Sequence, residues 1–323
     1  MRKTPAIVAA SALVLSLAAC AAPSGPAVDG GTPLDAASCA PVWERGGVAV
    51  DVTATGDFGV APIDPSFPIP LVARERTSTA IVHPGDGAIV GPTDIVAGTI
   101  TLVDGATGMV LDQTPSTIYL PLTGASPLFD AAVCAPVGSR VAAVGTTEAL
   151  LGAGVVAQSG IDPEQTIVAV LDIEDAFIGR AQGRTLPPLN GLPSVSLAAT
   201  GQPGLSFTNA TPPAELRIET LIQGSGTTVA EGDTVLLQYT GVNWNTRKVF
   251  DSSWERGTPA QFATTDVVAG FGQALVGQQV GSQVLAAIPP AYGYGDSPPS
   301  GSGIGATDTL VFVIDILGVL PAT

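Results

Sequence analysis

The sequence predicts a mainly β protein of two related domains, each with an antiparallel sheet and one short helix. Runs such as "TVLLQYTGV" from Thr234 and "TLVFVIDIL" from Thr309 are rich in β-branched residues and bounded by Gly, Pro or Asp, which is typical of strands. Between Asp266 and Val280 the apolar spacing changes to i, i+4, i+7 and i+8, which predicts a short helix. Two glycines weaken that helix, so we expect packing on the sheet to stabilise it.

An internal repeat supports the division into two domains. The stretch "VAGTITLVDGATGMVLD" (96–112) aligns with "VLLQYTGVNWNTRKVFD" (235–251) at an offset of 139. Further on, "GIDPEQTIVAVLDI" (160–173) aligns with "GIGATDTLVFVIDI" (303–316) at an offset of 143. The copies therefore differ by four residues in one intervening loop. We expect domains at 45–178 and 193–323, joined by a linker at 179–192.

The N-terminus predicts an exported, lipid-anchored protein. Arg2 and Lys3 precede an apolar run too short to span a bilayer, so residues 1–19 are expected to be a signal peptide. The ending "LAAC" resembles a bacterial lipobox, which would lipidate Cys20 and leave 20–44 as the lipidated Cys and a flexible tether. We expect the mature chain on the outer face of the bacterial cytoplasmic membrane. The alternative is an ordinary secretory signal with an incidental cysteine.

Cysteine content and charge limit the chemistry further. Apart from Cys20, only Cys39 and Cys134 remain, and two thiols in an oxidising compartment favour a disulfide, with two free buried cysteines as the alternative. The chain has 12 basic and 28 acidic residues, and losing Arg2 and Lys3 takes its net charge from −16 to −18. Nucleic acid is therefore a poor partner. Membrane attachment would depend on the lipid, because anionic headgroups repel such a surface.

Four consecutive blocks resemble one enzyme family: "GSGTTVAEGDTVLLQYTG", "VFDSSWERGTPAQF", "VGSQVLAAIPPAYGYG" and "TLVFVIDIL". Over residues 217–318 the chain resembles the FK506-binding-protein class of peptidyl-prolyl cis/trans isomerases. The resemblance implies an α+β fold, in which a curved antiparallel half-barrel sheet wraps around one short α-helix. It also implies proline-containing polypeptides and FK506-like macrolides as ligands, and no metal or cofactor.

The resemblance assigns a role to each residue of an apolar pocket. Catalytic roles fall on residues of the pocket wall and on its acid: Tyr239, Phe250, Asp251, Tyr294 and Phe312. Substrate-binding roles fall on the remaining pocket residues: Arg256, Phe262, Val267, Val268, Phe271 and Ile304. Asp251 and Arg256 would pair and order the tyrosine hydroxyl. The chain departs from the family in three features: Phe271 replaces the usual Trp floor, Ala260 replaces a common aromatic, and loop 296–303 is one residue longer.

The first copy of the repeat lacks this set. Apolar residues stand at the aligned positions, and only an aspartate survives: Ile100, Leu111, Leu128, Leu151, Ala169 and Asp112. His83 is the only histidine and aligns with a strand end, so a His-dependent triad in the second domain is excluded. Ser252 and Ser253 are expected to be turn residues and Trp254 a surface residue. The predicted function is an isomerase for exported proteins, with a non-catalytic polypeptide-binding protein as the alternative.

Overall fold

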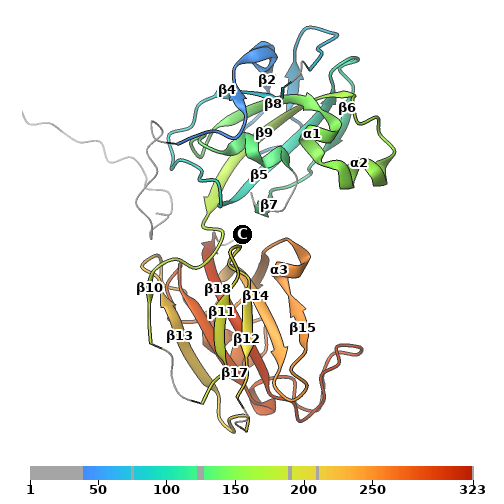
Figure 1. Cartoon of the computed structure of the whole chain (residues 1–323). Coiled ribbons are helices and arrows are strands. Elements are labelled where there is room, and N and C mark those ends of the chain that lie inside the picture. The colour runs from blue at the N-terminus through green and yellow to red at the C-terminus, as the bar shows by residue number, and fades with distance from the viewer. Residues whose placement is uncertain (1–38, 74–75, 122–126, 188–190, 209–210, 322–323) are drawn as a thin grey trace, which may run out of the picture.

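The computed structural model describes residues 39–73, 76–121, 127–187, 191–208 and 211–321, and Cys20 lies outside them. Within this part of the chain, two seven-stranded sheets form two domains (Figure 1). The first sheet contains β1 (Glu44–Arg45), β4 (Ser78–His83), β5 (Ile95–Asp104), β6 (Val110–Gln113), β7 (Ile118–Pro121), β8 (Arg140–Thr146) and β9 (Thr166–Phe177). The second contains β10 (Arg184–Thr185), β13 (Arg217–Gln223), β14 (Thr234–Asn243), β15 (Val249–Ser252), β16 (Ala260–Ala263), β17 (Gln283–Ile288) and β18 (Leu310–Leu320).

The two sheets have the same strand order and the same register. The orders are β1-β4-β8-β9-β5-β6 and β10-β13-β17-β18-β14-β15, with β7 added to β5 and β16 added to β14. Ile95 pairs with Phe177 in the first sheet, and Thr234 pairs with Leu320 at the corresponding position of the second. Both pairings shift register two residues further on, after Ala97 and after Leu236. The strands are antiparallel except for β1, which runs parallel to β4.

Both faces of each sheet carry a hydrophobic cluster. Successive side chains of a strand point to opposite sides, so one strand contributes to both clusters. In β18, Phe312 and Ile314 face a core beneath the sheet, whereas Val311 and Val313 face a second cluster on the other side. Two short hairpins provide the second cover: β2 (Thr53–Thr55) with β3 (Asp64–Ser66), and β11 (Ser194–Leu197) with β12 (Pro203–Ser206). The hairpin that follows the first strand of each sheet is therefore part of that domain's core.

Helices are short in both domains, and the expected α+β class is confirmed. Against the second sheet lies α4 (Ala269–Leu275), in the segment where the sequence predicts a helix, and a 3-10 helix (Pro127–Ala132) occupies the aligned place in the first domain. The structure thus differs there from the expected α-helix. The remaining helices are η1 (Gly47–Asp51), α1 (Thr147–Leu151), α2 (Ala153–Ser159), α3 (Ser253–Arg256) and η3 (Pro290–Tyr292). Within the described ranges no helix is long and apolar enough to cross a membrane.

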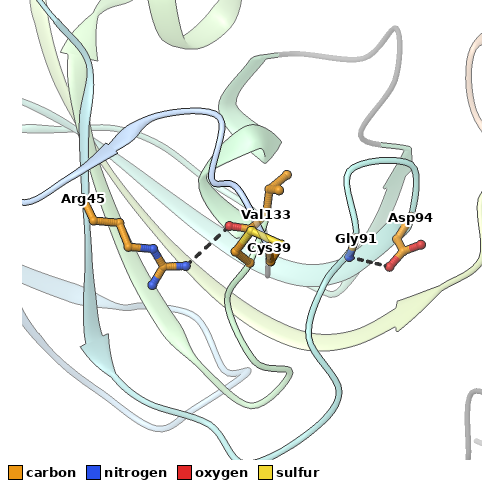
Figure 2. Close-up of a disulfide and its surroundings, with 6 residues drawn as sticks. Cys39, Arg45, Gly91, Asp94 and Val133 are labelled. Carbon is orange, nitrogen blue, oxygen red and sulfur yellow. Dashed lines mark hydrogen bonds between the residues drawn. A yellow bond between two sulfur atoms is a disulfide. The ribbon is translucent and has the colours of Figure 1, made fainter. Parts of the chain in front are cut away.

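A disulfide joins Cys39 to Cys134, as the sequence predicts, with the two Cα atoms 5.6 Å apart (Figure 2). It connects the chain before β1 to the segment after the 3-10 helix. Close to the bridge, Arg45 Nη2 donates a hydrogen bond to the carbonyl oxygen of Val133 at 3.5 Å. The start of the described chain is therefore attached to the first domain by a covalent bond as well as by β1.

The two domains share packing where β9 ends. Phe177 and Ile178 belong to the hydrophobic core of the second domain, together with Ile95 and Ala97 of β5. The Phe177 ring lies against Gly318 of β18, where a Cβ would come within 2.4 Å of the ring. Glycine at this position therefore lets the ring of one domain contact the backbone of the other.

Candidate active site

Three buried aromatic residues form the centre of the candidate site. Tyr239 lies on β14 and Phe312 on the neighbouring strand β18, and both side chains point to the face that α4 covers. Phe271 of α4 meets them edge-on, with ring centroids 6.0 Å from Tyr239 and 5.0 Å from Phe312. Edge-to-face contacts at these distances are favourable, so the three rings fix the position of α4 on the sheet.

A glycine brings a fourth ring into the cluster. Gly241 pairs with Phe312 across the strands, and a Cβ on Gly241 would lie 2.6 Å from Cζ of Phe250 and 2.9 Å from Cε1 of Phe312. Its absence allows the rings of Phe250 and Phe312 to meet edge-on at 5.5 Å. Phe250 on β15 is thereby placed beside the buried centre although its own strand is at the edge of the sheet.

Partly exposed apolar side chains surround this centre. The site residues assigned from the sequence come together here from β15, β16, the segment before α4 and the connection between β17 and β18: Phe250, Phe262, Val267, Val268, Tyr294 and Ile304. Tyr292 and Ala260 pack against the same core. Among described residues the Tyr294 hydroxyl has no hydrogen-bond partner, so it is free to donate to a bound molecule.

A charged pair supports the buried tyrosine from one side. The Tyr239 hydroxyl donates to Asp251 and accepts a hydrogen bond from Arg256 Nη2 at 3.1 Å, and Arg256 also forms an ion pair with Asp251. Burial, followed by the hydrogen bond to Asp251, raises the pKa of Tyr239 to about 12. Burial opposes the charge of Arg256, but its bonds to Tyr239 and Asp251 prevail and raise the pKa of this guanidinium. The tyrosine is therefore a neutral phenol at physiological pH, with its proton directed at Asp251.

Tyr239, Asp251 and Arg256 are called the triad below. Two serines next to it have contacts that the sequence analysis missed. Ser253 Oγ accepts a hydrogen bond from the Tyr239 backbone nitrogen at 2.8 Å and donates to the side chain of Gln238. Ser252 Oγ lies 3.1 Å from Thr240 Oγ1. Both serines are buried, so they join β15 and α3 to β14 and are more than turn residues.

The comparisons with known proteins concern this second domain. Residues 225–317 match the model of the FKBP-type peptidyl-prolyl cis-trans isomerase family. An FK506-binding protein of Streptomyces anulatus is 38% identical over 120 residues, which make up 36% of this chain and 97% of that protein. The chain belongs to the FKBP-type peptidyl-prolyl cis-trans isomerase family.

One further relative agrees with this assignment, and one solved structure is similar in sequence over part of the chain. A probable FK506-binding protein of Corynebacterium glutamicum is 39% identical over 106 residues, covering 32% of this chain and 87% of that protein. The crystal structure of FkpA from Escherichia coli is 29% identical in sequence, covering 42% of this chain and 54% of that one with a TM-score of 0.32. By the family model and the two FK506-binding proteins, the chain is an isomerase of the FKBP type.

The first domain places other side chains at the equivalent positions of its isomerase-like sheet. Its aligned residues are apolar and belong to or pack on its own core: Ile100, Leu111, Leu128, Leu151 and Ala169. Asp112, the counterpart of Asp251, accepts only a bond from the Gln113 backbone nitrogen in the described structure. His83 ends β4, as expected. Across the described ranges, no group of three or more His, Cys, Asp or Glu side chains could hold a metal ion.

Proposed function

We propose that the second domain isomerises Xaa-Pro bonds by binding the proline ring over Phe271, inside the circle of partly exposed apolar side chains. The observation that carries this proposal is the joint placement of the aromatic centre and the Tyr239–Asp251–Arg256 triad. All eleven residues assigned from the resemblance belong to this one apolar cluster or to the triad.

Such a site suits the physical problem of prolyl isomerisation. Rotating the amide costs about 18–20 kcal/mol because resonance is lost, while the cis and trans forms of a prolyl bond differ little in energy. A twisted amide is less polar than a planar one, so an apolar surface stabilises it relative to water. No nucleophile is needed. Tyr294 supplies a hydroxyl donor for a flanking carbonyl, and the triad keeps the wall formed by Tyr239 in place.

We propose that this activity serves exported proteins at the cell surface. The support is the N-terminal sequence, in which the expected signal peptide ends at the lipobox-like "LAAC". Substitution Cys20→Ala should leave an uncleaved precursor without acyl label. Lipid incorporation at the parental level in this variant would contradict the anchor, and release of mature protein into the medium would favour an ordinary secretory signal.

For the first domain we propose polypeptide binding without catalysis. The support is the contrast between its matching sheet register and its missing tyrosine and arginine. Residues 179–323 should accelerate isomerisation of an Xaa-Pro peptide and bind FK506-like macrolides, whereas residues 39–178 should do neither. If 179–323 gave only the uncatalysed rate while 39–178 bound unfolded polypeptide, the binding function would replace the enzyme.

A further inference from the structure

Trp254 lies between two residues that hold Tyr239. It is the second residue of α3, and its neighbour Ser253 accepts a hydrogen bond from the Tyr239 backbone nitrogen. Two positions later, Arg256 donates to the Tyr239 hydroxyl and pairs with Asp251. An isolated helix of four residues is unstable, because nucleating a helix costs more free energy than the hydrogen bonds of a single turn contribute. The position of α3 must therefore be fixed by contacts with other parts of the domain, which include the hydrogen bonds of Ser253 and the packing of Trp254.

The indole of Trp254 packs on a glycine outside the isomerase sheet. A Cβ on Gly201 would lie 3.1 Å from Trp254 Cη2 and 3.0 Å from Arg180 Cδ. Gly201 lies in the turn between β11 and β12, with a positive φ of 98°. Its backbone is therefore in close contact with the tryptophan of α3 and with an arginine from the stretch between the domains. A larger residue in this place would clash with both side chains.

The indole is held by packing alone. Trp254 Nε1 is buried and has no hydrogen-bond partner in the described structure. The indole N–H of a tryptophan normally donates a hydrogen bond to water or to a protein group. Trp254 makes no such bond in the described structure, so we attribute the position of its indole to packing against the hairpin turn.

The other side of the contact is fixed to the second domain. Arg180 Nη1 donates to the Ala199 carbonyl oxygen at 3.2 Å, which holds the turn between β11 and β12. The next residue, Ala181, donates its backbone N–H to the buried carboxyl of Asp315 at 2.8 Å. A continuous series of contacts thus runs from the end of β9 through this stretch and the hairpin turn to α3. Figure 1 shows α3 at the end of the second domain that faces the first.

We propose that Trp254 is a positioning residue for catalysis, which seats α3 against the hairpin turn so that Arg256 and Ser253 reach Tyr239. The inference rests on the proposed role of the triad. It makes the β11–β12 hairpin and Arg180, both outside the residues that match the family model, part of the isomerase site. The path of the chain from the first domain then affects the geometry of the site in the second.

The test is a double-mutant cycle in the full-length protein, with isomerisation of an Xaa-Pro peptide as the assay. The variants are Trp254→Ala, Arg256→Ala and the double substitution. Phe207→Ala is the matched control, because Phe207 is an aromatic residue following the same hairpin that packs on Trp244 and contacts Arg247 instead of α3. Trp254→Ala should lower kcat/KM roughly 3- to 10-fold, a typical coupling between contacting residues, while Phe207→Ala leaves it within twofold.

The decisive result is non-additivity. Because Trp254 is proposed to act through Arg256 as well as Ser253, Trp254→Ala should cost less in the Arg256→Ala background than in the parent. An equal loss in the two backgrounds overturns the inference alone. An Arg256→Ala protein as active as the parent overturns the proposed triad and this inference with it.

A milder pair of variants tests the same contact if Trp254→Ala does not fold. Arg180→Ala removes the other wall of the Gly201 contact and should lower kcat/KM about two- to threefold through the same cycle with Arg256→Ala. Trp254→Phe keeps an aromatic ring but loses the partnerless N–H and the Cη2 atom nearest Gly201, so it should recover only part of the activity. Parental activity in Arg180→Ala would contradict the proposed packing role. Where Trp254→Ala does fold, no recovery in Trp254→Phe relative to it would contradict that role as well.

Discussion

Substituting Tyr239→Phe tests the triad with the least disturbance of the aromatic centre. The ring stays and keeps its contacts with Phe271 and Phe312, while the hydroxyl that joins Asp251 to Arg256 is lost. Hydrogen bonds to charged groups contribute about 1.5–3 kcal/mol. The side chains of Arg256 and Asp251 are 46% and 41% exposed, so water compensates part of the loss and about 1–2 kcal/mol remains. This corresponds to a decrease of roughly 5- to 30-fold in kcat/KM.

The assay is the cis-to-trans isomerisation of an Xaa-Pro peptide, followed at several substrate concentrations to separate kcat from KM. Tyr292→Phe is the matched control, since it removes a hydroxyl from another partly buried tyrosine outside the triad. An absorbance titration adds a second readout: the tyrosine that ionises near pH 12 in the parent should be missing from Tyr239→Phe. A Tyr239→Phe protein with parental kcat/KM would refute the view that the triad shapes the site.

Two further predictions concern stability. Replacing both Cys39 and Cys134 by Ser opens a loop of 95 residues and should lower the free energy of unfolding of the first domain by about 4–5 kcal/mol in urea denaturation; a loss below about 1 kcal/mol would contradict the chain-entropy estimate. Burial raises the pKa of Asp315 from 3.8 to about 6 despite its bonds to Ala181 and Gln283, so the folded protein binds this proton more tightly than the unfolded chain. The contribution of this group to the free energy of unfolding therefore decreases as the pH rises from about 4 to about 6, by up to about 3 kcal/mol. Asp315→Asn should flatten that slope in denaturation curves measured across this pH range. An unchanged slope would exclude Asp315 as its source.

The sequence predicts the sheets well because their pattern is local and repeated. The constant offsets 139 and 143 between the copies reappear as matching strand pairs and matching register shifts in β5/β9 and β14/β18. The helix of the first domain is different, because its end depends on a distant residue. Cys134, bonded to Cys39, follows it with a positive φ of 64°, and the preceding hydrogen bonds are of the tighter i to i+3 kind, such as Val133 N to Asp130 O.

The side chains of the site likewise fall into two groups: those that the sequence identifies and those whose contacts only the structure reveals. The aromatic residues, Asp251 and Arg256 were identifiable because they occur in blocks that resemble a known family. Ser253 and Trp254 lie inside one of those blocks, but their contacts depend on Tyr239 of another strand and on Gly201, 53 positions earlier in the chain. Neither serine nor tryptophan has a spacing that indicates such a contact. Only the packed structure reveals that these residues support the site.

The boundary of the isomerase domain leads to a last prediction. Residues 179–192 are expected from the sequence to join the two domains, yet β10 within them adds a strand to β13, and Ala181 binds the buried Asp315. The first domain uses the equivalent aspartate for the same purpose: Asp172 pairs with the buried Arg140 and accepts the Gly59 backbone N–H, which holds the covering segment to its sheet.

In a fragment that starts at residue 193, Asp315 keeps its hydrogen bond from Gln283 but loses the one from Ala181. Because an unpaired buried oxygen costs about 1–3 kcal/mol, this fragment should unfold at a lower urea concentration than one that starts at 179. The shorter fragment also lacks Arg180, so by the Trp254 argument it should be less active at a temperature where both are folded. Circular dichroism at increasing urea, with the isomerase assay run in parallel, measures both differences. Equal midpoints and equal kcat/KM for the two fragments would show that the stretch from 179 to 192 is only a connection, and that β10 and the Ala181 contact do not contribute to the domain.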